Sequence, residues 1–309
     1  MAILKLQPSF KDYPWGGKRL VTDFHKAYDG DILAESWELS CHKDGPCYIA
    51  NGSHAGKTLA EYVQGEGKAA LGTNFAKFDQ FPILIKFIDA AQDLSVQVHP
   101  DDAFARQLEK EPYGKTEVWY VVDCAPGAYL YYGFSKEISR DEFARRIKEN
   151  TLLEVLNKVE VKKGDVFFIE AGTIHAIGAG CLIAEIQQNS NLTYRVYDYG
   201  RKDKNGNARE LHVSKALQVT AREPLPLKNF APHIAACKYF TVDRVAVDGS
   251  YAGKVEQTSF VSILVVDGAG KLTAGEETVS FCKGDSLLLT ADTGAYTLEG
   301  NCDVLLTTL

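Results

Sequence analysis

Residues 164–175 read GDVFFIEAGTIH: a glycine and an aspartate, an apolar run, a second glycine and finally His175. β-Branched and aromatic residues favour strands and glycines favour turns, so the segment predicts a strand followed by a turn. The pattern returns 120 residues later, because residues 163–175 align without gaps with residues 283–295, with five identities and matching apolar positions. We therefore expect one strand–turn–strand element to be used twice. His175 corresponds to Ala295, so at this position only the first copy carries a side chain that can bind a metal.

Strand-like runs dominate the rest of the chain. Runs rich in Val, Ile, Phe and Tyr occupy residues 81–88, 128–132, 182–187 and 261–266. Helical patterns are confined to residues 58–64, 101–110, 139–154 and 213–220, and Ser139 with Glu142 gives the third of these a capping-box start. Because strands and helices do not alternate regularly, the pattern disfavours a parallel doubly wound sheet. It predicts a mainly β protein, built as a sandwich or barrel with a few helices.

A proline-containing segment divides the chain. Pro224 and Pro226 lie within residues 222–227, where they block a continued helix or a central strand, so the segment is interpreted as a linker. We predict a metal-binding catalytic domain with helical segments over residues 1–230. Residues 231–309 are predicted to form a smaller all-β structural domain without metal ligands.

Composition limits the classes of partner. A chain of 309 residues can bury a large core, and its net charge of −7 argues against nucleic acid or an anionic membrane as partner. Seven cysteines, an odd number without a C-x-x-C pair, fit reduced thiols in a cytosolic protein. No window approaches the ~18 apolar residues that span a bilayer, so a soluble, cytoplasmic protein is expected. The oligomeric state is left open.

Four polar side chains form a candidate divalent-metal site. Gln97 and His99 are two residues apart in a strand-like run, so both side chains should point to one face of a sheet. Glu117 opens another strand-like run, and His175 follows the segment described first. One amide, two imidazoles and one carboxylate from neighbouring strands are suitable ligands for a divalent metal. Lys115 alternates onto the same face as Glu117, so its amine should also reach this site. The other histidines, at positions 25, 42, 54, 212 and 233, are interpreted as ordinary hydrogen-bonded residues.

Longer motifs resemble a known family. Gly164, Gly172 and His175 match the cupin pattern G-x5-P-x-G-x2-H, with Glu170 at its proline position. Residues 82–89, 94–102, 114–120 and 188–199, together with residues 14–17 and 35–38, resemble class I mannose-6-phosphate isomerases in their short bacterial form. This resemblance covers essentially the whole chain. It implies a cupin-type jelly-roll sandwich or barrel, with a smaller jelly-roll-like C-terminal domain.

The resemblance also implies a reaction and a ligand set. In this family a single zinc ion is held at the positions of Gln97, His99, Glu117 and His175, and an arginine at the position of Arg195 takes part in catalysis. The implied reaction interconverts mannose 6-phosphate and fructose 6-phosphate by moving a proton between C1 and C2 through an enediol. A small sugar phosphate is therefore the expected partner.

Three further side chains receive expected roles. Arg195 can form bidentate hydrogen bonds to enediolate or phosphate oxygens. Lys115 can bind substrate oxygens or take part in proton transfer, and Glu185 is a second candidate acid or base. Asn191 departs from longer family members, which carry an acidic residue there, so a role for that carboxylate is not transferred to this chain.

Two other function classes use the same residues. A cupin oxygenase would hold iron with the same histidines and carboxylate, and it would consume oxygen. A sugar-phosphate-binding protein without catalysis would retain the fold alone, although such a protein is expected to have lost some of the ligands.

Overall fold

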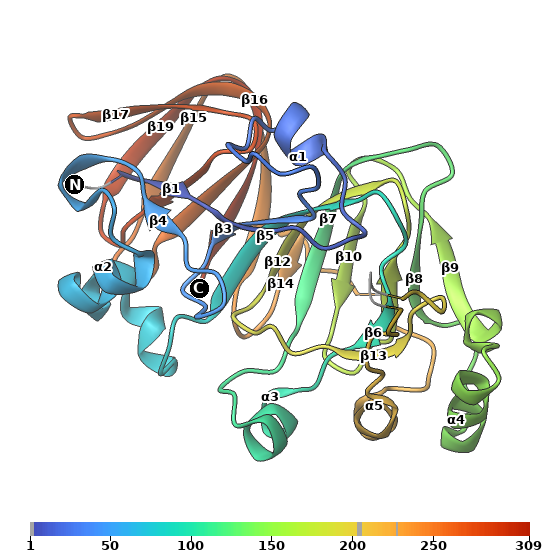
Figure 1. The fold of residues 1–309 in the computed structure, drawn as a ribbon. Coiled ribbons are helices and arrows are strands. Elements are labelled where there is room, and N and C mark those ends of the chain that lie inside the picture. Colours follow the sequence, from blue (N-terminus) through green and yellow to red (C-terminus); the bar gives the residue numbers. More distant parts are fainter. Residues whose placement is uncertain (1–2, 203–205, 227) are drawn as a thin grey trace. The chain divides into compact units, whose positions relative to one another are not determined.

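Antiparallel strands form the framework of both structural units of the chain. The computed structural model describes residues 3–202, 206–226 and 228–309 (Figure 1). Unit one comprises the described residues within Met1–Pro14, Lys18–Phe87 and Phe230–Leu309, and unit two comprises those within Trp15–Gly17 and Ile88–Asn229. The chain leaves unit two near the boundary expected at residue 230, but residues 18–87 group with the C-terminal segment. The division into domains 1–230 and 231–309 stays a prediction.

Unit two contains one complete sheet and a second group of strands. Its five-stranded sheet has the order β13-β6-β11-β8-β9, and β7 lies between β10 and β12 in the other group. The strands are β6 (Val96–Val98), β7 (Glu117–Cys124), β8 (Tyr129–Phe134), β9 (Leu156–Glu160), β10 (Val166–Ile169), β11 (His175–Ile177), β12 (Cys181–Gln188) and β13 (Tyr194–Tyr197).

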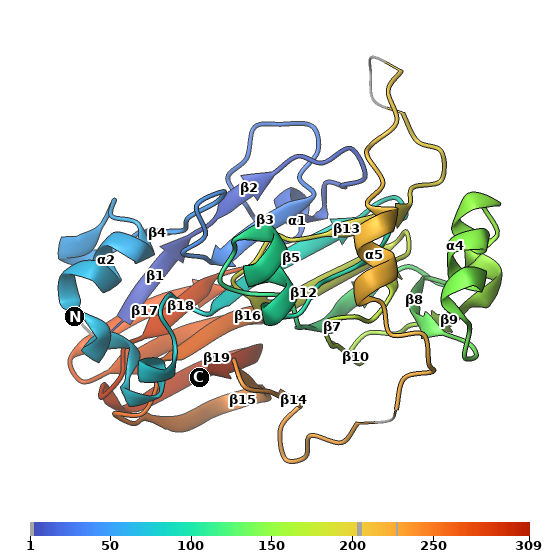
Figure 2. The ribbon, with the colours of Figure 1, turned by 90° about the horizontal axis from the view of Figure 1, so that it is seen from below.

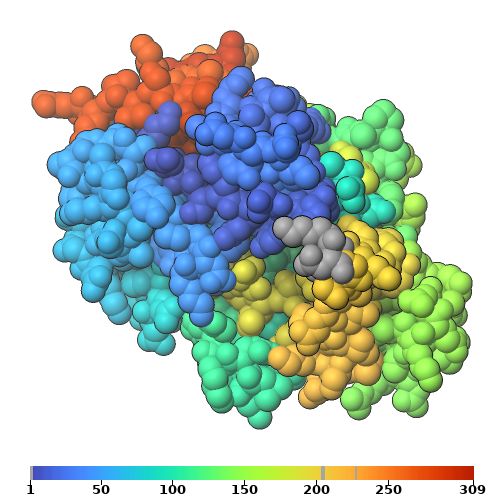
Figure 3. All heavy atoms as spheres, in the orientation of Figure 1, coloured from blue at the N-terminus to red at the C-terminus, as the bar shows by residue number. Residues whose placement is uncertain are grey.

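The helices of unit two cover the outer face of the five-stranded sheet. Val96 and Val98 pack in one apolar cluster with residues of α4 (Arg140–Lys148) and α5 (Val213–Val219), which Figure 2 shows outside this sheet. In the space-filling view of Figure 3 both helices reach the surface. Gln97 alternates with these valines and therefore faces the interior of the unit. The remaining helical elements are α3 (Asp102–Phe104), a π-helix at Ala105–Glu109 and a 3-10 turn at Leu152–Val155.

The helix expected at residues 139–154 is shorter than predicted. Its start is confirmed, since Ser139 Oγ accepts the amide of Glu142 at 3.0 Å. The helix ends at Lys148 because Asn150 takes a left-handed conformation (φ 56°) and the Thr151 amide closes back onto the Arg146 carbonyl at 2.9 Å. This is the pattern of a Schellman C-cap. The predictions for residues 58–64, 101–110 and 213–220 are confirmed as helical segments.

Unit one is built on one large antiparallel sheet. Neighbouring strands of this sheet follow the order β14-β15-β19-β16-β18-β1-β4, and β17 pairs with β16. The strands are β1 (Ile3–Gln7), β2 (Ser9–Lys11), β3 (Glu35–Leu39), β4 (Tyr48–Ile49), β14 (Ala235–Ala236), β15 (Thr241–Val255), β16 (Val261–Ala274), β17 (Glu277–Cys282), β18 (Ser286–Leu289) and β19 (Gly294–Thr308), and β5 (Ile83–Ala90) contributes residues to both units. The helical elements are α1 (Arg19–Thr22), α2 (Leu59–Glu66) and 3-10 turns at Gly52–His54, Lys68–Leu71 and Thr73–Lys77.

The repeated sequence element has the same local structure in both copies. Gly164 and Gly284 both have left-handed backbones, with φ of 91° and 93°, which glycine adopts without steric cost. The carboxylates of Asp165 and Asp285 each accept the amide three residues earlier, at 3.0 and 2.8 Å. The strand that follows pairs with β7 in the first copy and with β16 in the second. The predicted repeat is therefore confirmed as a repeated turn and strand.

The strands of the two copies lie opposite different residue types. Ile169 lies opposite Glu117, whereas the equivalent Leu289 lies opposite Val261. Ala295 occupies the position of His175 in the aligned sequences. Leu287 and Leu289 of the second copy are buried in the apolar core of unit one.

The fold class predicted from the sequence is confirmed as mainly β. All four predicted strand segments are strands. In the predicted linker, residues 222–226 form neither helix nor strand, and residue 227 lies outside the described residues. Among the residues that the structure describes, no helix is long and apolar enough to cross a membrane.

Candidate metal centre

Three predicted ligands from three strands meet inside unit two. His99 directly follows β6, Glu117 begins β7 and His175 begins β11. One ligand atom from each lies within 4.8 Å of the others, and all three residues are buried. His175 Nε2 is 3.3 Å from Glu117 Oε1, and His99 Nε2 is 3.7 Å from Glu117 Oε2. The arrangement matches the donor set expected for a divalent metal.

Backbone carbonyls fix the orientation of both imidazoles. His99 Nδ1 is 2.7 Å from the carbonyl of Leu192, and His175 Nδ1 is 2.9 Å from the carbonyl of Thr173. A carbonyl can only accept, so each Nδ1 carries the proton and donates it. Each Nε2 is then unprotonated and turned toward Glu117, as in histidines that bind metals. Neither carbonyl could be identified from residue types.

Gln97, the fourth predicted ligand, lies beside the same cluster. It is directly opposite His175 in the pairing of β6 with β11, and its Nε2 is 3.3 Å from His175 Nε2. The amide oxygen, which is the atom that can bind a metal, belongs to the same planar group. The structure therefore brings all four predicted ligands together.

The Lys115 ammonium brings a positive charge into this cluster. Its Nζ is 2.6 Å from Glu117 Oε2, 3.2 Å from His99 Nε2 and 3.4 Å from Glu185 Oε1. Both Glu117 oxygens are nevertheless buried without a hydrogen bond of regular geometry. An anion this deeply buried requires positive charge nearby. The Glu117 carboxylate and the two imidazoles therefore fit a bound divalent cation.

Burial and neighbouring charges control ionisation in the cluster. Burial, reinforced by the Lys115 charge, lowers the pKa of His99 to about 4, and burial also lowers the pKa of His175. Burial alone would raise the pKa of Glu117, but Lys115 and the two histidines outweigh it and hold that pKa well below its usual range. Near neutral pH the site is therefore one carboxylate and two neutral imidazoles, the protonation state that a metal requires.

The metal-free protein is expected to lose stability in mild acid. The unfolded chain protonates His99 near pH 6.5 while the folded chain holds it neutral down to about pH 4. Between these values the unfolded state binds more protons, so the free energy of unfolding falls as pH falls. From pH 7 to pH 5 His99 should account for about 2 kcal/mol, and His175 acts in the same direction. Denaturant titrations of the chelated protein at pH 7 and pH 5 would measure this fall in the free energy of unfolding. An equal fall in the chelated His99→Gln variant would exclude His99 as its source.

Trp119 and Glu185 extend the site on the side of Lys115. Trp119 Nε1 donates to Glu185 Oε2 at 2.7 Å, and the two residues lie opposite each other on β7 and β12. The Trp119 ring meets the His175 ring edge-on, with centroids 5.2 Å apart. Sequence reasoning missed Trp119, although its alternation with Lys115 and Glu117 was a signal that could have found it.

Arg195 stands on the neighbouring strand β13. It lies opposite Gln97 in the pairing of β13 with β6, so both side chains point to the same face. Its Nε donates to Ser95 Oγ at 3.2 Å and its Nη1 donates to the Glu210 carbonyl at 3.1 Å. The guanidinium is thus held by two polar groups that carry no charge at the contact atoms.

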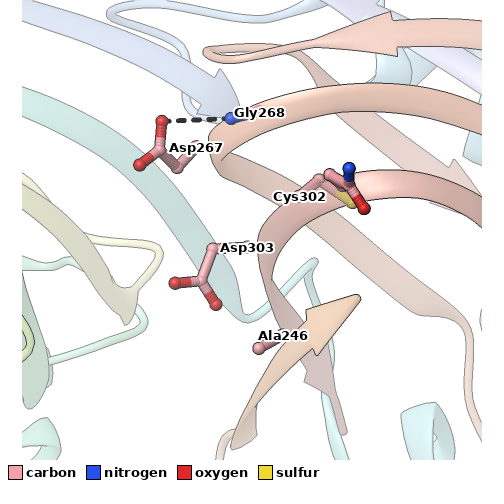
Figure 4. A pocket seen from close by; sticks show the side chains of 6 residues that line it. Ala246, Asp267, Gly268, Cys302 and Asp303 are labelled. Carbon is pink, nitrogen blue, oxygen red and sulfur yellow. Dashed lines mark hydrogen bonds between the residues drawn. The ribbon is translucent and has the colours of Figure 1, made fainter. Parts of the chain in front are cut away.

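A shallow pocket in unit one lacks such a donor set. It encloses about 380 Å³ and is lined by Ala246, Asp267, Gly268, Asn301, Cys302 and Asp303 (Figure 4). Asp267 accepts the amide of Gly268 at 3.1 Å, and Asp303 forms an ion pair with Arg244 at 2.5 Å. Both carboxylates are therefore already engaged.

Comparison with known proteins places this arrangement in a family. A model of the phosphomannose isomerase type I catalytic domain matches residues 3–118, and a model of the mannose-6-phosphate isomerase cupin domain matches residues 231–309. Mannose-6-phosphate isomerase ManA of Bacillus subtilis is 37% identical over 316 residues, covering 99% of this chain and 98% of the relative. A crystal structure of the mannose 6-phosphate isomerase of Bacillus subtilis superposes with a TM-score of 0.91 at 33% identity, covering all of both chains. A zinc-bound mannose 6-phosphate isomerase shares the fold at 18% identity, with a TM-score of 0.78 over 99% of each chain.

The fold and the buried His–Glu–His cluster define a protein of the cupin class with a candidate metal site. Within that class, the similarity to ManA over almost the whole chain is decisive. The chain belongs to the type I mannose-6-phosphate isomerase family and is an enzyme of that family.

Proposed function

We propose that the chain interconverts mannose 6-phosphate and fructose 6-phosphate with the help of one zinc ion bound by Gln97, His99, Glu117 and His175. The observation that carries this proposal is the pair of imidazoles whose Nδ1 atoms are fixed by carbonyls and whose Nε2 atoms face a buried carboxylate. The zinc of the distant zinc-bound isomerase belongs to that protein, and it supports zinc here only through the shared fold.

The reaction moves a proton between C1 and C2 and places negative charge on the oxygens of an enediol. When bound, zinc supplies positive charge that stabilises these oxygens. Arg195 adds a permanent charge with a planar donor fork that can bind two oxygens at once. We infer that its Ser95 and Glu210 contacts hold the fork toward the substrate.

The contact between Lys115 and Glu185 supports a role for both in the proton-transfer part of the proposed reaction. Lys115 Nζ lies 3.4 Å from Glu185 Oε1, and the same nitrogen also contacts Glu117 Oε2. We propose Lys115 as the catalytic residue that contacts substrate oxygens, with Glu185 completing the acid–base pair. Trp119 orients Glu185 through its indole N–H.

Three broader expectations form part of the proposal. The small sugar phosphate is the partner of the site, and neither nucleic acid nor membrane is proposed. Each of the seven cysteines, all within the described residues, is a thiol and not part of a disulfide, and we propose that the protein acts in the reducing cytoplasm. Residues 1–230 are proposed to act as the catalytic domain and residues 231–309 as its structural counterpart.

A coupled assay tests the proposal directly. Formation of fructose 6-phosphate from mannose 6-phosphate is measured before chelation, after chelation and after zinc is restored, with metal content determined at each step. We expect turnover to disappear with the metal and to return with stoichiometric zinc. Full turnover by the metal-free protein would contradict the proposal, as would oxygen consumption that depends on iron.

A further inference from the structure

Residues 210–212 bond to Arg195 on the side that faces away from β6. Its strand β13 is at one end of the five-stranded sheet and has a strand partner, β6, on one side. The other side of Arg195 is bonded by residues 210–212. Edge strands are easily displaced unless their free backbone groups are paired.

His212 supplies both backbone bonds on this outer side. The Arg195 amide donates to His212 Nδ1 at 3.2 Å, and the His212 amide donates to the Arg195 carbonyl at 2.7 Å. The imidazole nitrogen thus takes the place of the carbonyl that a neighbouring strand would offer. Together with the Glu210 carbonyl on Nη1, these bonds fix both the backbone and the guanidinium of Arg195.

The place of His212 in the helix does not explain why this residue is a histidine. It is the N-cap residue of α5, where a side chain normally accepts an amide of the first helical turn. The His212 side chain makes no such bond, and its acceptor nitrogen faces Arg195 instead. The local structure therefore uses this side chain for Arg195 rather than for the helix.

We propose that His212 is a positioning residue of the isomerase, holding Arg195 in the orientation that catalysis requires. This inference rests on the proposed role of Arg195. It adds a residue outside the proposed metal ligands and outside the residues proposed to contact the substrate, and it assigns the 210–212 segment to the active site. A shift of about 1 Å in a catalytic group can lower a rate by up to about a hundredfold, so the effect is measurable.

The acceptor role requires a neutral imidazole. Burial lowers the pKa of His212; Arg195 and Lys215 reinforce this, whereas Glu210 and Glu109 oppose it. Near neutral pH the ring is therefore unprotonated at Nδ1 and can accept the Arg195 amide. Protonation in acid would replace this bond by a repulsion between two donors.

Two substitutions separate positioning from folding. His212→Leu removes the acceptor, and we expect kcat to fall about tenfold with KM changed less than about twofold and zinc content unchanged. His212→Asn places an amide oxygen near the position of Nδ1 and should restore most of kcat. Because asparagine does not titrate, the ratio of the activity of His212→Asn to that of wild type should rise as the pH falls through the lowered pKa of His212. Thermal unfolding of each variant checks that the fold is intact.

The Arg195→Ala background identifies which proposal fails. If His212 acts through Arg195, His212→Leu should cause no further loss in that background. Three results would overturn the positioning role of His212 alone. His212→Leu could keep the wild-type kcat, or His212→Asn could fail to recover the kcat that His212→Leu loses. His212→Leu could also lower kcat by the same factor in the Arg195→Ala background as in wild type. Full turnover of zinc-loaded Arg195→Ala would instead overturn the proposed role of Arg195, and the inference with it.

Discussion

Replacing His99 by alanine is expected to remove bound zinc and to lower turnover at least about a thousandfold, because several kcal/mol of charge stabilisation are lost. The Nε2 atom of His99 faces Glu117, and the Leu192 carbonyl fixes the ring in the metal-binding tautomer. Within the described part of the chain no other imidazole can take its place, since His175 already occupies the opposite side of Glu117. Metal analysis together with the coupled assay measures both effects.

A matched substitution separates loss of a ligand from loss of a histidine. His54 lies in unit one, pairs with Glu66 at 3.8 Å and meets the Tyr62 ring edge-on, so His54→Ala should retain both zinc and turnover. Thermal unfolding of the two variants shows whether each is folded. Retention of both zinc and full activity by His99→Ala would refute the metal-site assignment.

Strand periodicity predicted which side chains of the candidate site share a face. Gln97 and His99 share a face since side chains alternate along a strand, and the same rule placed Lys115 beside Glu117. The gapless alignment of residues 163–175 with residues 283–295 predicted the repeated element, in which Gly164 and Gly284 adopt left-handed backbones. Family resemblance supplied the reaction, which spacing alone did not specify.

The remaining features depend on contacts that residue types do not encode. The Leu192 carbonyl orients His99 through its backbone, and any residue could provide that atom. His212 was interpreted as an ordinary histidine because the pairing of residue 195 with residue 212 is a tertiary contact. The helix beginning after Ser139 ended early because Asn150, a residue tolerated in left-handed conformations, closes it.

Arg195→Ala is expected to lower kcat by about a hundredfold or more while the protein keeps its zinc. The guanidinium would stabilise charge that develops in the transition state, and loss of one such donor typically costs this much. Metal content should be unchanged because Arg195 bonds to Ser95 and Glu210 rather than to the His–Glu–His cluster. A fall in kcat with little change in KM is the signature of an interaction made in the transition state.

Arg195→Lys distinguishes charge from geometry at the same position. Lysine keeps one positive charge but lacks the planar fork, so it should recover only part of the loss if two oxygens are bound at once. Arg145, an exposed arginine of α4 that pairs with Glu149 at 2.7 Å, provides the matched control, and Arg145→Ala should leave kcat unchanged. Full recovery with lysine would show that charge alone suffices. Unchanged kcat and KM in Arg195→Ala would remove Arg195 from the mechanism, and proton transfer would then depend on Lys115 and Glu185 beside the metal.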